Sequence, residues 1–176
     1  SVNFVREWNG RASGRIKTMF GPHAPYTCPP EYLEEVIGLA RQYGVGLHIH
    51  VAETRDEIRQ IKESYGTTPV RHLDNIGLFE LPVLAAHCVH LDQEEIEIMA
   101  AKKVGVAHCP ESNMKLASGI APVNRMLAAG VKVGLGTDGA ASNNNLDMLE
   151  EMRSASLLQK VANEDPVVLP SFESLK

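Results

Sequence analysis

Residues 45–54 read Val45-Gly46-Leu47-His48-Ile49-His50-Val51-Ala52-Glu53-Thr54, and this stretch decides the fold. Its apolar, β-branched residues predict a buried strand over residues 45–51. Side chains two residues apart in a strand point to the same face, so His48 and His50 share a face, and Glu53 follows where the strand pattern ends. A histidine and a carboxylate at a strand end can hold a metal ion and transfer protons beside it. The alternative is a buried histidine beside a helix-capping segment.

The same pattern of a strand followed by a helix recurs along the chain. Strands are expected over residues 16–20, 45–51, 82–86, 104–107 and 131–137. Helices are expected to begin at Pro29-Pro30, Thr54, Thr68-Pro69, Asp92, Pro122 and about Asn145. Residues 1–15 show no period, residues 109–113 are expected as a loop, and residues 165–176 as a tail. Continuous apolar strands that alternate with amphipathic helices are typical of an α/β fold with a parallel sheet covered by helices.

Polar groups follow the carboxyl ends of these strands. They are His23, His50 with Glu53, His87, His108 and Asp138. Active sites of (β/α)8 barrels lie on that face, and a doubly wound open sheet also binds its ligands there. No glycine-rich nucleotide-binding motif follows a strand, which disfavours the doubly wound fold. Five strand–helix units are too few to close a barrel, so we expect strands 4–8 of a barrel, with an open sheet as the alternative.

The composition predicts an ordinary soluble domain spanning residues 1–176. Apolar residues make up 44% of the chain and charged residues 22%, and the net charge of −5 disfavours nucleic acid and anionic membranes as partners. The start of the chain lacks the basic-then-apolar plan of a signal peptide, and no apolar run approaches a membrane span. The three cysteines form no C-x-x-C pair. We therefore expect a reducing, cytoplasmic setting.

Four stretches are together similar to the amidohydrolase superfamily, and within it to the deaminases of 5′-methylthioadenosine and S-adenosylhomocysteine. They are His50-Val51-Ala52-Glu53-Thr54, Ala86-His87-Cys88-Val89-His90-Leu91, His108-Cys109-Pro110-Glu111-Ser112-Asn113-Met114-Lys115-Leu116 and Gly136-Thr137-Asp138-Gly139-Ala140-Ala141-Ser142-Asn143-Asn144. The resemblance runs from about Trp8 to Pro170. It implies hydrolytic attack at C6 of an adenine nucleoside, which yields the inosine analogue and ammonia.

The resemblance also implies a role for each site residue. His50 and Asp138 would be ligands of one divalent metal ion, zinc or alternatively iron, and Asp138 would help to activate the water. Glu53 would be the proton shuttle that contacts the purine ring nitrogen. His87 would hydrogen-bond the attacking water or the developing tetrahedral centre. His23 would contact the ribose of the substrate.

The chain departs from the family pattern in one respect. The family's first metal ligands form a His-x-His pair on strand 1, whereas the His-x-His of this chain, His48-Ile49-His50, corresponds to strand 5. We therefore expect a barrel without its N-terminal strands and C-terminal continuation, with activity belonging to a longer protein. The alternatives are a guanine, cytosine or triazine deaminase or chlorohydrolase, and a non-catalytic fragment. The expected partner is a small-molecule substrate, and a homo-oligomer is left open.

Several polar residues have a structural interpretation. We expect His48 to pack below His50, His90 to lie in a loop or helix cap, and His72 to lie at the surface. His108 is expected to make a structural hydrogen bond within the barrel mouth. The cysteines beside His87 and His108 are expected to be buried among the helices. Finally, the segment Asn143-Asn144-Asn145 can form a turn and an N-cap independently of any ligand.

Overall fold

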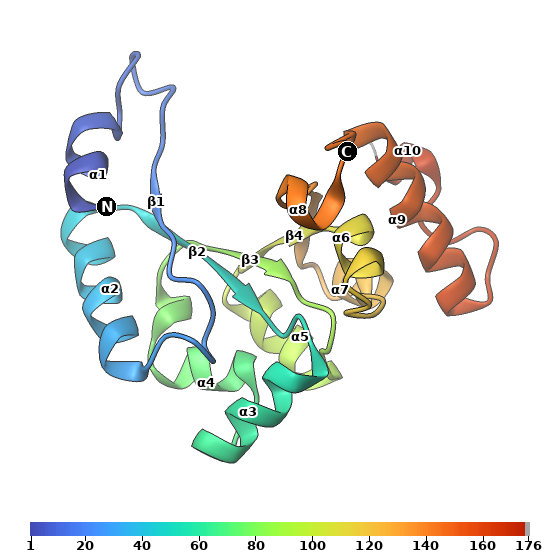
Figure 1. The fold of residues 1–176 in the computed structure, drawn as a ribbon, viewed down its shortest axis with the longest axis horizontal. Coiled ribbons are helices and arrows are strands. Elements are labelled where there is room, and N and C mark those ends of the chain that lie inside the picture. The colour runs from blue at the N-terminus through green and yellow to red at the C-terminus, as the bar shows by residue number, and fades with distance from the viewer. Residues whose placement is uncertain (175–176) are drawn as a thin grey trace.

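The computed structural model describes residues 1–174 and contains a five-stranded parallel sheet (Figure 1). Its strands are β1 (Met19–Phe20), β2 (Gly46–Val51), β3 (Val83–His87), β4 (Gly105–His108) and β5 (Lys132–Leu135). They lie side by side in chain order, whereas a doubly wound sheet reverses its order at a switch point. The α/β fold predicted from the sequence is thus confirmed as one arc of a (β/α)8 barrel.

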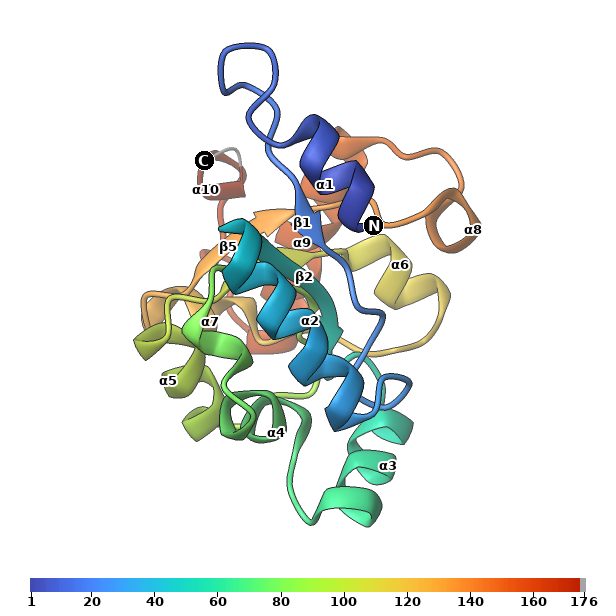
Figure 2. The same ribbon diagram turned by 90° about the vertical axis from the view of Figure 1, so that its left-hand side faces the viewer.

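Helices connect the strands and cover the outer face of this arc. They are α1 (Val2–Trp8), α2 (Pro30–Tyr43), α3 (Arg55–Tyr65), α4 (Pro69–Asn75), η1 (Leu78–Glu80), α5 (Gln93–Ala101), α6 (Pro110–Lys115), α7 (Val123–Ala128), α8 (Ala140–Asn143), α9 (Met148–Asn163) and α10 (Ser171–Ser174). Figures 1 and 2 show α2, α4 and α5 against one side of the sheet. Among the described residues, no helix is both long and apolar enough to cross a membrane.

Local sequence signals set several of the helix ends. Gly44 and Gly66 adopt left-handed backbone after α2 and α3, which ends each helix because its last carbonyls then bond to the cap. Asp92 and Glu95 form a reciprocal capping box at the start of α5. These contacts involve residues close together in the chain, so the sequence pattern predicts them directly.

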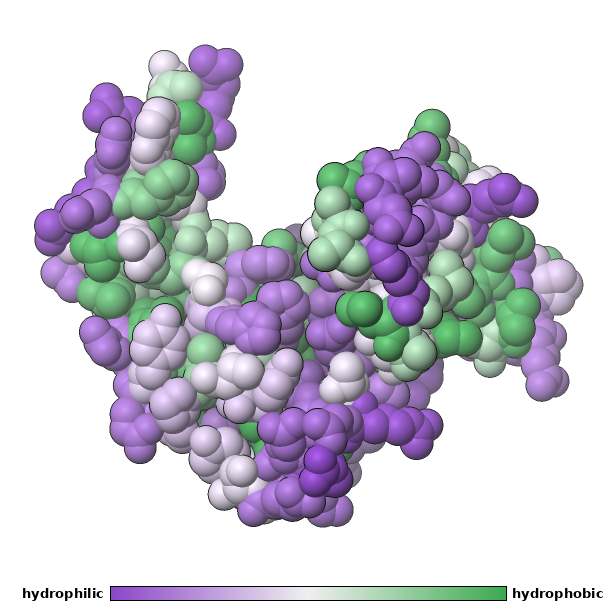
Figure 3. All heavy atoms as spheres, viewed as in Figure 1, coloured by the Kyte–Doolittle hydropathy of each residue, from purple (hydrophilic) through white to green (hydrophobic). Residues whose placement is uncertain are grey.

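The two faces of the sheet differ in burial. In β2, Leu47, Ile49 and Val51 are fully buried beneath the helices, whereas His48 and His50 are half-buried on the opposite face. That opposite face would line the interior of a barrel. Figure 3 shows the molecule hollowed above it, between the N-terminal arm and the C-terminal helices.

Five stretches differ from the elements expected from the sequence. Residues 1–15 contain α1, because Val5 packs into the core, and residues 109–113 lie largely in α6, whose polar residues Ser112 and Asn113 are buried by tertiary contacts. The first strand is shorter than residues 16–20. The long helix begins at Met148, since Asp147 caps it in place of an asparagine. The expected tail contains α10, and its residues 175–176 lie outside the described residues.

Gly46 allows β2 to lie close to the neighbouring chain. A Cβ atom there would lie 2.6 Å from the carbonyl oxygen of Pro82 and 2.9 Å from the side chain of Met19. Because the nearer atom belongs to the backbone, it cannot move aside cheaply, and Gly46→Ala should lower the free energy of unfolding by about 1–3 kcal/mol. Urea denaturation measures this change. Gly134→Ala in β5 is the control, since nothing lies within 4 Å of its Cβ position, and an equal loss in both variants would contradict the steric argument.

Candidate functional site

Three side chains at the carboxyl edge of the sheet converge closely enough to hold a metal ion. One potential ligand atom from each of His50, His87 and Asp138 lies within 4.8 Å of the others. Glu53 borders this cluster, with its Oε2 atom 3.8 Å from Nε2 of His87, and Asp138 Oδ2 lies 3.9 Å from the same nitrogen. The strands thus bring together residues that are far apart in the chain.

His50 is oriented by the loop that follows β1. Its Nδ1 atom lies 2.6 Å from the carbonyl oxygen of His23, and its backbone amide donates to the same oxygen at 3.0 Å. Because a carbonyl oxygen only accepts hydrogen bonds, Nδ1 carries a proton, and in the neutral ring the lone pair is then on Nε2. A second hydrogen bond of this kind commonly orients histidines that bind metals.

His87 leaves the regular alternation of its strand. Register pairs Val51 with His87, so alternation alone would turn His87 towards the helices with Val83 and Ala85. Its φ angle of 71° breaks that pattern, and its ring stacks on the ring of His50 with 5.4 Å between centroids. The Nδ1 atom lies 2.9 Å from Asn113 Oδ1, which directs Nε2 towards the two carboxylates. The left-handed backbone therefore makes His87 part of the cluster.

Asp138 follows β5 in left-handed backbone, with a φ angle of 60°. Its Oδ2 atom accepts hydrogen bonds from the hydroxyl groups of Ser112, at 2.7 Å, and Ser142, at 2.8 Å. Partial burial alone would raise the pKa of Asp138, but these hydrogen bonds, the Gly139 amide and the nearby His87 together lower it. Asp138 is therefore a carboxylate near neutral pH.

The loop that follows Asp138 is anchored on both sides. Lys115 donates to the carbonyl of Ala141 at 2.8 Å and to the side chain of Asn144 at 2.5 Å. On the other side, the buried carboxylate of Glu151 accepts hydrogen bonds from the side chain of Asn143 and from the backbone amide of Glu111. Burial raises the pKa of Glu151 to about 7. These contacts hold the loop and α6 together behind Asp138.

Glu53 is held by both its side chain and its backbone. The hydroxyl group of Ser118 donates to Glu53 Oε1 at 3.3 Å, and the backbone amide of Glu53 donates to Glu57 at 2.8 Å. The side chain of Glu53 remains 19% exposed, so solvent and small molecules can reach it. His23 lies at the rim, where its ring is 5.0 Å from that of His50 and its Nδ1 atom is 2.7 Å from Thr27 Oγ1.

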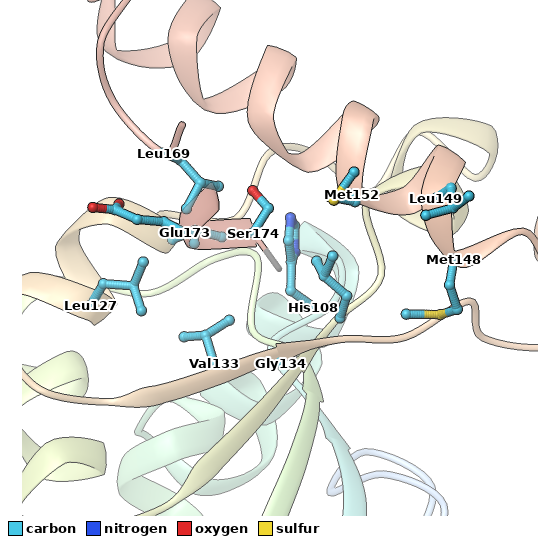
Figure 4. Close-up of a pocket in the computed structure, with 12 residues that line it drawn as sticks. His108, Leu127, Val133, Gly134, Met148, Leu149, Met152, Leu169, Glu173 and Ser174 are labelled. Carbon is cyan, nitrogen blue, oxygen red and sulfur yellow. The ribbon is translucent and has the colours of Figure 1, made fainter. Parts of the chain in front are cut away.

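The structure separates His108 from this cluster. His108 is 1% exposed and lines a cavity of about 330 Å³ between β5 and the helices α7, α9 and α10, and neither ring nitrogen has a hydrogen-bond partner (Figure 4). The expected hydrogen bond within the barrel mouth is therefore wrong. His108 in β4 pairs in register with Leu135 in β5, and this position lies on the helix-facing side of the sheet. Alternation along the strand therefore turns the His108 side chain away from the barrel mouth.

The other histidines and the cysteines fit their structural interpretations with one exception. His48 lies on the same face as His50 and contacts the Leu84 carbonyl at 3.0 Å, and His90 lies in a loop. The expectation that His72 lies at the surface is wrong, because this residue is 5% exposed and its ring stacks on that of Tyr65 with 4.3 Å between centroids. All three cysteines are buried and unpaired, and burial raises the pKa of the Cys88 and Cys109 thiols.

Several residues around the site were not anticipated from the sequence. Ser112, Asn113 and Ser142 lie in the quoted motifs, so their neighbourhood was visible but their individual contacts were not. Ser118 carries no local signal. Thr54 and Glu57 have the spacing of a capping box, but only half of it forms. Thr54 accepts from the Glu57 amide, while the Glu57 carboxylate reaches the amides of Ala52 and Glu53.

The donor chemistry of the cluster fits a divalent metal ion. Imidazole nitrogen and carboxylate oxygen are ligands that zinc and similar ions prefer. Nε2 of His50 carries a lone pair, and Asp138 is ionised, so both groups are in the form that coordinates a metal. The cluster thus places groups able to bind a divalent metal ion at the carboxyl edge of the strands, where (β/α)8 barrels carry their active sites.

Comparison with known proteins identifies the family. The family model described as "Amidohydrolase family" matches residues 2–175, so the chain belongs to this family. It is 75% identical over 176 residues to the 5-methylthioadenosine/S-adenosylhomocysteine deaminase of Pelotomaculum thermopropionicum and 66% identical over 168 residues to that of Desulforudis audaxviator. These matches cover 100% and 96% of this chain, but only 41% and 39% of the relatives.

Solved structures share this fold. An adenosine deaminase from Xanthomonas campestris with bound zinc superposes with a TM-score of 0.89 at 40% identity, covering 94% of this chain and 38% of that one. A guanine deaminase from C. acetobutylicum with bound guanine superposes with a TM-score of 0.88 at 26% identity, covering 98% and 43%. Zinc and a small-molecule ligand are thus found in structures with this fold.

Burial of His108 should make the stability of the chain sensitive to acid. Burial and the nearby His87 lower the pKa of His108 to about 4. Between pH 6.5 and 4 the unfolded chain therefore binds a proton that the folded chain does not, so stability falls as pH falls, by on the order of 3 kcal/mol. Urea denaturation of wild type and His108→Leu at pH 7 and pH 4.5 measures this difference.

His108→Leu should lack the fall in stability at low pH that arises because His108 binds a proton in the unfolded chain. The buried Glu57 and Glu151, with pKa values raised to about 7, act in the opposite direction. They keep their protons longer in the folded chain, so their contribution decreases as pH rises from 4.5 to 7. Only the difference between wild type and variant isolates His108. Between pH 7 and pH 8 the free energy of unfolding should change equally in wild type and variant. Equal changes down to pH 4.5 would contradict the prediction.

Proposed function

We propose that this chain carries the metal-binding and proton-transferring part of an enzyme that hydrolytically deaminates an adenine nucleoside. The observation that carries the proposal is the convergence of His50, His87, Asp138 and Glu53 at one edge of the sheet. The relatives named 5-methylthioadenosine/S-adenosylhomocysteine deaminase support those two nucleosides as the substrate class. The products would be the inosine analogue and ammonia.

His50 and Asp138 are proposed to hold one metal ion, and zinc is proposed because the related adenosine deaminase contains it. Such an ion supplies Lewis acidity, which lowers the pKa of water towards neutrality. Asp138, which is ionised, also accepts a proton as the water attacks. His87 presents Nε2 between the two carboxylates and hydrogen-bonds the attacking water or the tetrahedral centre at C6.

Glu53 is the proposed proton carrier. A carboxyl group that protonates the purine ring nitrogen makes C6 electrophilic, and once it has taken up a proton that the attacking water loses, the same group can protonate the leaving amine. Its side chain is partly exposed and borders His87, as both transfers require. His23 lies at the rim of the site, where we propose that it contacts the ribose.

Residues 1–176 are proposed to be one part of the amidohydrolase barrel domain. The chain spans about two fifths of the length of the relatives that it matches, since 41% of the first relative is covered. The remaining ligands of the metal would come from strands outside this arc. The buried, unpaired thiols support a reducing compartment such as the cytoplasm.

The substrate class can be tested with the complete polypeptide that carries these residues. With zinc bound, ammonia release should be fastest from 5′-methylthioadenosine and S-adenosylhomocysteine, and slower from adenosine. Guanine, cytosine and an aminotriazine are the competing substrates, because the similar structures include a guanine deaminase and triazine hydrolases. If guanine or the triazine were the best substrate, the nucleoside assignment would be wrong. A zinc-loaded protein that released no ammonia from any of them would contradict deamination altogether.

The division of roles between Glu53 and Asp138 can be tested by substitution. Glu53→Gln should lower kcat by about 100-fold or more with zinc content unchanged, because a general acid–base group is lost while the ligands remain. Asp138→Asn should lower both zinc content and kcat. Zinc analysis by atomic absorption and steady-state kinetics measure these effects. Glu34→Gln, an exposed change on α2, is the control. Loss of zinc in Glu53→Gln would show that Glu53 is a ligand instead.

A further inference from the structure

Glu57 uses both carboxylate oxygens to hold two consecutive backbone amides. Oε1 accepts from the amide of Ala52 at 2.8 Å, and Oε2 accepts from the amide of Glu53 at 2.8 Å. Glu57 is 1% exposed and lies in the first turn of α3. A buried carboxylate is costly unless its oxygens are hydrogen-bonded, and here each oxygen has a partner.

The segment that Glu57 holds has an unusual backbone. Ala52 has a φ angle of 53°, in the left-handed region that alanine rarely adopts, and such a conformation persists only where its surroundings fix it. On its other side, the Ala52 carbonyl accepts from the amides of Val89 at 3.1 Å and His90 at 2.9 Å. The turn is therefore held through both its amides and its carbonyl, and Glu53 follows directly from it.

The contrast with α5 shows that capping of a helix does not explain this arrangement. At the start of α5, Glu95 lies three residues after Asp92 and reaches back to the Asp92 amide, which completes a capping box. At the start of α3, Glu57 has the same spacing from Thr54. Its carboxylate nevertheless reaches past Thr54 to Ala52 and Glu53, although Thr54 already caps the helix.

We propose that Glu57 is a positioning residue, which fixes the turn at Ala52 and thereby aims the Glu53 carboxylate at the site. The proposal rests on the role proposed for Glu53 in proton transfer. Glu57 itself does not touch the site cluster. It acts through the backbone of Glu53, whose carboxylate lies 3.8 Å from His87 as a result.

Glu57→Gln removes one of the two hydrogen bonds with little change of shape. A glutamine offers one acceptor oxygen, and its amino group would face a second N–H donor, so one buried backbone amide loses its partner. The turn should then relax and displace Glu53. Because misplacement of a catalytic group by about 1 Å can cost about 100-fold in rate, we expect kcat to fall by about 10- to 100-fold. KM should change less than about twofold, and zinc content should be unchanged.

Steady-state kinetics of four variants in the complete polypeptide test the proposal. They are Glu57→Gln, Glu53→Gln, the double variant, and Glu95→Gln. Glu95 is a matched control, because it is a buried capping glutamate, 2% exposed, that does not touch Glu53. If Glu57 acts through Glu53, the double variant should be no slower than Glu53→Gln, within about twofold. Glu95→Gln should lower Tm but leave kcat unchanged.

Two kinetic outcomes would overturn the proposal. One is a rate loss in Glu57→Gln that is no larger than the loss in Glu95→Gln. The other is a double variant in which the two rate losses multiply, since Glu57 would then act independently of Glu53. Glu57→Asp supplies a further check. Its shorter side chain keeps the charge but cannot reach both amides, so it should not restore the rate.

Amide hydrogen exchange tests the same contacts without relying on activity. In Glu57→Gln, the amides of Ala52 and Glu53 should exchange at least about 10-fold faster, while that of Leu47, which donates to the Pro82 carbonyl within the sheet, keeps its protection. If wild type released no ammonia from any substrate, the proposed function would fail, and exchange alone would decide whether Glu57 fixes the turn. Unchanged exchange at both amides would overturn the inference in either case.

Discussion

Ala52, His87 and Asp138 have φ angles of 53°, 71° and 60°, and each lies at or just after the carboxyl end of a strand. Left-handed backbone is unfavourable for these residue types and persists only where neighbouring contacts fix it. At His87 it turns an imidazole from the helix-covered face to the open face of the sheet. At the other two positions it redirects the chain so that Glu53 and the Asp138 carboxylate border the same space. The cluster depends on these three breaks in regular strand geometry.

Buried carboxylates stabilise two of these breaks in similar ways. Glu57 lies behind the loop after β2, and Glu151 lies behind the loop after β5, each accepting hydrogen bonds from nearby chain segments. Burial raises the pKa of both groups to about 7. Each therefore makes the folded state less stable as pH rises towards neutrality, a cost that the hydrogen bonds offset in part. Groups that touch no reacting atom thus take part in shaping the site.

The sequence predicts the arc of strands and helices well because its signals are local. Apolar runs mark β2 to β5, and Gly44, Gly66 and the Asp92–Glu95 pair mark helix ends. It also predicts which residues meet, since parallel strands bring their carboxyl ends to one edge. Alternation along a strand cannot predict the orientation of His87, which depends on one φ angle. The sequence pattern also does not identify α6 or the contact of Ser118 with Glu53, because both depend on tertiary packing.

The order of the strands also bears on how the chain reaches this structure. Every strand of the sheet pairs with the next one along the chain, so no pairing has to wait for a distant segment. Parallel sheets fold slowly because each strand pairing must first close a long crossover. Here each crossover joins two consecutive strands and contains no other strand of the sheet. The arc can therefore grow by successive addition of units, in the order in which a ribosome delivers them. The edge that carries the site would then be assembled progressively, with Asp138 added last.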